Sequence, residues 1–186
     1  MNTVQRNEII DYQTYDERRD QIRRETMGVK EARRVHLGKC LTFLFENHDT
    51  IRYQIQEMMR AEQIVRESDI QREIETYNQL LGSQDELGCT LLIEIDDPAQ
   101  RQSLLREWLE LPKHLYLKTP SGKRMYARFD ERQVGEDRLS SVQYLKFDTG
   151  GEAPAAIGSD LPQLEEEAPL SEAQRHALTQ DLEAIP

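Results

Sequence analysis

The sequence predicts an α+β fold, in which a mainly antiparallel sheet of about five strands carries helices on one face. Five segments have the apolar or alternating pattern of strands, and they lie near residues 36–45, 89–95, 114–118, 123–129 and 139–147. The last three are too close in sequence for parallel crossovers, so they are expected to pair antiparallel. The strands outnumber the short crossover helices between them, which favours an α+β arrangement.

Two helices are expected within the first 66 residues. Residues 16–34 predict an N-terminal helix, supported by acid–arginine spacings such as Asp20 and Arg24. The second helix spans about 50–66, with Asp49 as its N-cap. Its apolar stripe has helical spacing and consists of Ile51, Ile55, Met58 and Val65.

Capping signals place two more helices. Ser68 begins a capping box with Gln71, and Gly82 is a natural C-terminal stop for the helix that follows Ser68. Asp97 is expected to cap a further helix, because Pro98 suits its first position. Between and after these helices the strands complete the sheet.

The composition changes near residue 150. Residues 1–149 are expected to form a single α+β domain that includes the N-terminal helix. Residues 150–186 are acidic and rich in Gly, Pro, Ala and Glu, which is typical of a loosely held tail. A capping box of Ser171 and Gln174 predicts a short helix near its end.

The composition also indicates the cellular compartment in which the protein is expected. The chain has a net charge of −11, no apolar run long enough for a membrane span and no apolar N-terminal segment of the secretory type. Cys40 and Cys89 fit no metal or redox pair motif, so buried free thiols are expected. These features predict a cytoplasmic protein with no membrane association.

Familiar catalytic motifs are absent from the sequence. It contains no Walker loop, no glycine-rich dinucleotide fingerprint and no nucleophile elbow. The four histidines share no ligand spacing. We therefore assign no catalytic residue, no metal ligand and no cofactor from sequence.

The first candidate surface is the polar segment 45–62, "FENHDTIRYQIQEMMRAE". Glu62 falls within the apolar stripe of its helix, where a carboxylate would be partly buried and would need a partner unless it leans out. A polar pocket and a helix whose charges pair among themselves are both compatible with this pattern. The candidate binding residues are Glu46, Asn47, Gln54, Glu57, Arg60 and Glu62.

The second candidate surface is the hairpin 113–128. The stretch from Lys113 to Phe129 contains five basic residues and no acid, and its outward side chains include tyrosine. Such a face can hold an anion, RNA or an acidic partner, or it can dock the acidic segment "LEEEAPL" of the tail. The net charge of −11 argues against nucleic acid. The candidate residues are Lys118, Arg124 and Arg128.

Several long segments resemble one bacterial family. "LFENHDTIRYQIQEMMRAE" and "DERQVGEDRLSSVQYLKF" are similar to the two signature segments of domain-of-unknown-function family 3501, and "YNQLLG" followed by "LGCTLLIEIDD" adds to the likeness. The resemblance covers about residues 4–183. It carries no catalytic residues. Genes of this family often lie beside those for rubrerythrin-like and iron–sulfur or flavin oxidoreductase proteins, which implies a redox or oxidative-stress setting.

These observations lead to one main hypothesis and two alternatives. The main hypothesis is a cytoplasmic accessory or interaction protein, whose partner is a rubrerythrin-like or iron–sulfur/flavin oxidoreductase. The first alternative is a metal-binding protein or enzyme that uses carboxylates of the segment 45–62, with His48 as a further ligand. The second is anion or RNA binding through the hairpin. The sequence leaves open whether the chain forms a homo-oligomer.

Overall fold

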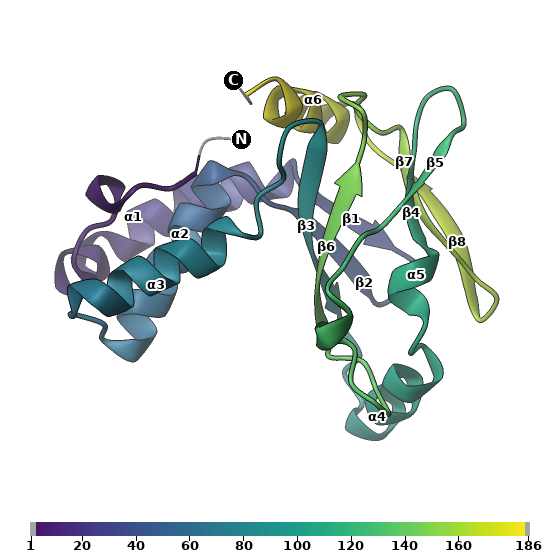
Figure 1. Cartoon of the computed structure of the whole chain (residues 1–186), viewed down its shortest axis with the longest axis horizontal. Coiled ribbons are helices and arrows are strands. Elements are labelled where there is room, and N and C mark those ends of the chain that lie inside the picture. The colour runs from purple at the N-terminus through teal and green to yellow at the C-terminus, as the bar shows by residue number, and fades with distance from the viewer. Residues whose placement is uncertain (1–2, 185–186) are drawn as a thin grey trace.

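A computed structural model describes residues 3–184, which form an N-terminal group of helices and two antiparallel sheets (Figure 1). We call the first group the helical unit. Its elements are η1 (Arg6–Glu8), α1 (Tyr12–Glu31), α2 (His48–Glu62) and α3 (Glu67–Asn78). The unit has its own apolar core, made by Val4, Ile9, Ile51, Ile55, Met59, Ile70, Ile74 and Leu81.

The first sheet has the strand order β1-β2-β3-β6, and every neighbouring pair is antiparallel. Its strands are β1 (Arg34–Leu37), β2 (Leu41–Phe45), β3 (Glu86–Ile93) and β6 (Val142–Asp148). The segment expected to be one strand near 36–45 is a hairpin instead. Its turn passes through Gly38, whose φ of 60° suits glycine.

The second sheet has the order β5-β4-β7-β8 and is also antiparallel. Its strands are β4 (Leu115–Lys118), β5 (Arg124–Tyr126), β7 (Ala156–Leu161) and β8 (Leu164–Pro169). Residues 3–184 therefore contain eight strands in two sheets, where about five in one sheet were expected. The α+β class and the hairpin of β4 and β5 are confirmed.

Residues 150–184, the described part of the expected tail, are more ordered than the loosely held segment that we expected for 150–186. They contribute β7 and β8, and Ile157 of β7 is fully buried. The sequence of β7, "AIGSDL", is rich in small residues with low strand propensity, so local pattern did not reveal it. A Cβ at Gly158 would lie 2.5 Å from the Tyr116 ring, so the close packing of this strand requires glycine.

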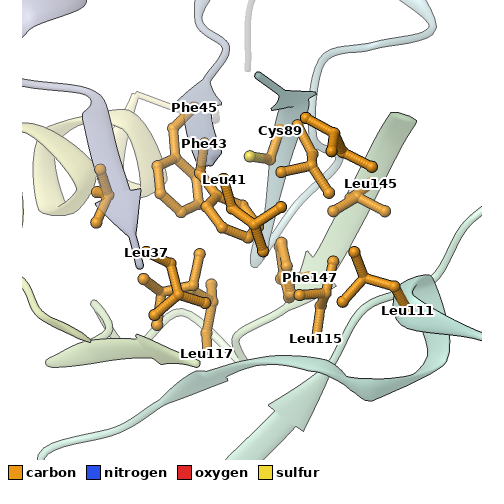
Figure 2. Packing of buried hydrophobic residues seen from close by; sticks show 14 of the residues in the cluster. Leu37, Leu41, Phe43, Phe45, Cys89, Leu111, Leu115, Leu117, Leu145 and Phe147 are labelled. Carbon is orange, nitrogen blue, oxygen red and sulfur yellow. The ribbon is translucent and has the colours of Figure 1, made fainter. Parts of the chain in front are cut away.

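The two sheets pack face to face around the main core (Figure 2). Phe43, Phe45 and Phe147 of the first sheet and Leu115 and Leu117 of the second have no appreciable exposure. Burial of each such side chain contributes roughly 1.5–3 kcal/mol, so this core is the main source of stability for the sheets.

The other helices lie around the sheets. They are α4 (Pro98–Glu107), α5 (Leu111–His114), η2 (Glu131–Gln133) and α6 (Glu172–Glu183). In Figure 1, α4 and α6 lie at opposite ends of the sheets rather than on one common face. The predicted caps are confirmed: Asp97 caps α4 with Pro98 in its first turn, and Ser171 and Gln174 form the capping box of α6.

Helix α2 differs from its prediction in both its cap and its apolar stripe. Asn47 rather than Asp49 is the N-cap, and its side chain accepts a hydrogen bond from the Thr50 backbone N–H. Met59 is buried and Met58 only half-buried. Val65 is 70% exposed beyond the C-terminal end of the helix. The true stripe therefore consists of Ile51, Ile55 and Met59.

The start of α3 also differs from its prediction. The helix begins at Glu67, and its N-cap Arg66 makes no side-chain capping bond, so Ser68 is not the cap. The helix ends at Asn78, before Gly82. Gly82 has another role, because a Cβ there would lie 2.0 Å from the Glu86 carbonyl oxygen. The chain after α3 can thus press directly against the start of β3.

No helix within residues 3–184 is both long enough and apolar enough to cross a membrane.

Candidate functional site

The contact between α1 and α2 accounts for two of the predicted residues. Glu57 accepts hydrogen bonds from the Tyr15 hydroxyl at 2.6 Å and from Arg19 at 2.7 and 2.8 Å. The hydrogen bond from Arg19 is the main reason that the pKa of Glu57 lies below its ordinary value. Arg60 forms an ion pair with Asp16. The charges of this segment are thus paired, but their partners come from α1 rather than from α2 itself.

Glu46 and Asn47 lie where the helical unit meets the first sheet. The buried Glu46 carboxylate accepts hydrogen bonds from Thr50 at 2.5 Å and Thr90 at 2.6 Å. The Asn47 amide donates to Asp181 of α6 at 3.5 Å. Both residues therefore connect the start of α2 to other elements of the fold.

Asp181 is itself half of a buried ion pair. Arg33, which follows α1, donates to its two carboxylate oxygens at 2.7 and 2.9 Å. The side chains of Arg33 and Asp181 are only 10% and 8% exposed. This pair joins the end of α1 to α6, the last helix of the chain.

The remaining two candidate residues of the segment 45–62, Gln54 and Glu62, make none of these contacts. Gln54 is half-buried and faces Tyr77 of α3. Glu62 is exposed, so the prediction that it is partly buried was wrong. The error follows from the apolar stripe, which does not extend to Val65. Within residues 3–184, no group of three or more His, Cys, Asp or Glu side chains is arranged to hold a metal ion.

The hairpin face is the name we give to the outer side of the second sheet, formed by His114, Tyr116, Lys118, Arg124, Tyr126, Asp160 and Glu167. Lys118 pairs with Glu167 at 2.8 Å, and Arg124 pairs with Asp160 at 3.4 Å. Glu167 belongs to the acidic segment of β8. Strand β7 separates this acidic segment from the basic hairpin, and the Glu167 side chain reaches across it to Lys118.

Aromatic side chains complete the hairpin face. The Arg124 guanidinium lies 4.3 Å from the ring centre of Tyr116. The Tyr126 hydroxyl donates to Asp160 at 2.6 Å, and His114 Nδ1 lies 2.8 Å from the same carboxylate. These bonds are the main causes that lower the pKa of Asp160, with that of Tyr126 the larger. The polar groups on this face thus satisfy one another.

The inter-unit groove lies between the C-terminal end of α3 and residues 128–133, with β6 as part of its lining. It has a volume of about 660 Å³, which is within the range of ligand-binding clefts. Its apolar and aromatic lining includes Leu80, Phe129, Tyr144 and Leu145. Of the nine predicted binding residues, this groove contains Arg128.

Charge in the inter-unit groove centres on Glu86, whose side chain is 3% exposed. It accepts hydrogen bonds from the Ser83 backbone N–H at 3.1 Å and hydroxyl at 3.0 Å. Arg128 forms an ion pair with it, and the Lys146 Nζ lies 3.7 Å away. Burial alone would raise the pKa of Glu86, but these partners hold it below its ordinary value. Two cations thus share one carboxylate.

The outer edge of β6 is covered by the same segment that lines the groove. Arg128 and Lys146 exchange two backbone hydrogen bonds, at 2.7 and 2.8 Å. The Gln133 side-chain amide accepts from the Tyr144 N–H at 2.9 Å and donates to the Tyr144 carbonyl at 3.4 Å. The amide of Gln133 therefore takes the place that a peptide group of a neighbouring strand would occupy.

Sequence reasoning missed Glu86, Tyr144 and Lys146. Tyr144 and Lys146 lie on the polar side of a predicted strand, so their outward direction could have been predicted. Their proximity to Arg128 and Glu86 depends on the pairing of β3 with β6 and on the bridge between Arg128 and Lys146. No local pattern indicates these contacts.

The fold and its surfaces define an α+β protein with two antiparallel sheets and a separate helical unit. Over residues 3–182 the sequence matches the family described as "Protein of unknown function (DUF3501)", and the chain belongs to this family. A solved structure of a protein of unknown function from Burkholderia pseudomallei K96243 is similar, with 28% identity and a TM-score of 0.89. The likeness covers 97% of this chain and 100% of that one. No curated protein matches the sequence.

Proposed function

We propose that the protein is an accessory interaction protein, which binds a segment of a partner protein in the inter-unit groove. The observation that carries this proposal is Tyr144, which is 41% exposed beside the two cations Arg128 and Lys146. The Tyr144 hydroxyl has no hydrogen-bond partner among residues 3–184. Exposed tyrosine and arginine side chains are the types that most often dominate binding energy in protein interfaces.

The charges of the groove favour a particular kind of segment. Glu86 is buried and already bonded, whereas the Arg128 and Lys146 side chains are 67% and 38% exposed. Asp130 also lines the groove, but Arg132 pairs with it. Arg128 and Lys146 therefore still outnumber Glu86 and suit a carboxylate. The lining of Leu80 and Phe129 suits an apolar side chain. The expected ligand is therefore a protein segment that combines acidic and apolar residues.

The family resemblance suggests which proteins to test as partners. Neighbouring genes of this family often encode rubrerythrin-like and iron–sulfur or flavin oxidoreductase proteins, so we place the interaction in a redox or oxidative-stress system of the cytoplasm. In this proposal the chain recognises or positions the oxidoreductase, and the redox chemistry belongs to the partner.

The test compares two exposed tyrosines. Wild-type, Tyr144→Ser and Tyr126→Ser chains are used to capture proteins from a lysate of the native host, and the captured oxidoreductase is then purified and titrated against each chain. We expect Tyr144→Ser to weaken binding at least about tenfold, since loss of a side chain that dominates an interface costs about 2 kcal/mol or more. Tyr126, which is 45% exposed on the hairpin face, is the matched control.

Two results would contradict the proposal. One is a partner that binds wild-type and Tyr144→Ser chains equally well. The other is enzyme-like turnover of a substrate by the purified chain without any partner, which would make the protein an enzyme in its own right.

A further inference from the structure

Lys30, in the last turn of α1, is buried without a conventional partner. The residue is 8% exposed, and its Nζ lies 5.0 Å from the ring centre of Tyr53. Among residues 3–184, no carboxylate lies within ion-pair distance of this ammonium and no acceptor forms a hydrogen bond with it. Within residues 3–184, Gln143 Oε1 is the one fully buried side-chain polar atom without a hydrogen-bond partner, so the Lys30 ammonium, although its side chain is largely covered, still reaches solvent with its three N–H donors.

Two arginines lie near the same ammonium. Burial is the main cause that lowers the pKa of Lys30, and the positive charges of Arg34 and Arg23 lower it further. Arg23 donates to the Tyr53 hydroxyl at 3.4 Å, and neither arginine has an ion-pair partner among residues 3–184. We call Arg23, Lys30, Arg34 and Tyr53 the Lys30 cluster.

The nearby carboxylates do not neutralise the Lys30 cluster. Glu46 and Glu57 act to raise the pKa of Lys30, so both lie within electrostatic reach. Glu46 is bonded to two threonine hydroxyls, however, and Glu57 is bonded to Arg19 and Tyr15. Neither carboxylate therefore forms an ion pair with Lys30, Arg23 or Arg34.

We infer that the Lys30 cluster binds an oxyanion, namely the phosphoryl or carboxylate group of a small molecule. Lys30 and the arginines supply positive charge and N–H donors, which are the groups that bind phosphate and carboxylate in proteins. The Tyr53 hydroxyl accepts from Arg23, which leaves its hydrogen available to the anion. A bound oxyanion would provide the ion-pair partner that Lys30, Arg23 and Arg34 lack among residues 3–184, and the solvent-accessible ammonium leaves a path for it.

The helix dipole limits the expected affinity. The C-terminal end of α1 carries partial negative charge, which favours a lysine there but opposes an anion. This effect accounts for a basic residue in the last turn, but it does not account for burial of that residue. The cluster shares no residue with the inter-unit groove, so the inference does not depend on the proposed function.

The experiment titrates the full chain with inorganic phosphate, and separately with acetate, by calorimetry at low ionic strength. We expect one phosphate per wild-type chain with a Kd on the order of 1 mM. Lys30→Met retains most of the apolar stem beside Tyr53 and should weaken binding at least about tenfold. Arg24→Gln removes the same charge from an exposed position on α1 and is the matched control, with no expected change.

Arg23→Gln gives a second test at an exposed position, where the fold is under little risk. We expect it to weaken phosphate binding about two- to fivefold, because solvent screens the charge of an exposed side chain. Tighter phosphate than acetate binding would assign the site to phosphoryl groups, and the reverse would assign it to carboxylates; either supports the inference. Absence of saturable binding of both anions to the wild type would overturn it. Equal losses in Lys30→Met and Arg24→Gln would also overturn it.

Discussion

The inter-unit groove and the hairpin face contain the same kinds of side chain in different states. On the hairpin face, Lys118 and Arg124 each have a carboxylate partner, and the Tyr126 hydroxyl is bonded to Asp160. In the groove, Arg128 and Lys146 share Glu86. The comparison teaches that a run of basic residues does not by itself mark a binding surface. What matters is whether the fold brings carboxylates to it.

The largest effect on stability should come from breaking the ion pair of Arg33 and Asp181, which the fold buries almost completely. Asp181→Ala leaves the Arg33 guanidinium buried without its partner, and we expect a loss of about 3–5 kcal/mol in the free energy of unfolding. Denaturant unfolding measures this loss. Asp69→Ala, which removes the partner of the exposed Arg72, is the control and should cost less than about 1 kcal/mol. Equal losses would mean that the pair of Arg33 and Asp181 is no more important than a surface pair.

The next-largest effect on stability is expected from Gly158→Ala, which tests whether residues 156–169 are an integral part of the second sheet. Gly158→Ala places a methyl group against the Tyr116 ring and the Glu166 carbonyl, so we expect a loss of about 1–3 kcal/mol. Thermal or denaturant unfolding reports it. Gly122→Ala is unsuitable as a control because of its φ of 90°, whereas Gly28→Ala has open space around it in α1 and should not destabilise. An unaffected Gly158→Ala chain would argue that β7 is not packed as described.

A smaller effect concerns the pH dependence of the groove. The pKa of Glu86 lies below its ordinary value, so the unfolded chain binds a proton at this residue more readily than the folded chain. Its contribution to stability is therefore present above the ordinary glutamate pKa of about 4.3 and is lost as the pH falls through the lower folded value. Glu86→Gln should flatten the acid limb of stability against pH. A slope identical to that of the wild type would show that Glu86 is not held by these partners.

The smallest effect is expected on the hairpin face. The Lys118 and Glu167 side chains are each about one-third exposed, so solvent screens their attraction. A double-mutant cycle of Lys118→Gln and Glu167→Gln should give a coupling of about 0.2–1 kcal/mol, weakened by salt. A coupling of zero at low salt would mean that the acidic strand does not neutralise the hairpin.

Local signals in the sequence predicted much of the fold. The hairpin of β4 and β5 follows from alternation around "TPSG", and the caps at Asp97 and Ser171 follow from short-range hydrogen bonding. The strand β7 could not be predicted in the same way. Its small residues are explained by the close approach of the Tyr116 ring, which depends on distant packing.

The candidate sites were predicted less completely, again for physical reasons. One assumption, that Val65 continues the stripe of α2, placed Glu62 in the interior. The α2 residues Glu57 and Arg60 find their partners on α1, and Glu46 finds one of its partners on β3. Such pairing depends on how helices and strands meet, which periodicity in one segment does not specify.

The central claim is that the groove, rather than the hairpin face, binds the partner. The most direct test measures the affinity of the captured, purified partner for two double variants that remove equal charge: Arg128→Gln with Lys146→Gln in the groove, and Lys118→Gln with Arg124→Gln on the hairpin face. We predict at least about a tenfold loss for the groove variant and an unchanged affinity for the hairpin variant. A loss confined to the hairpin variant, or equal losses in both, would contradict the claim.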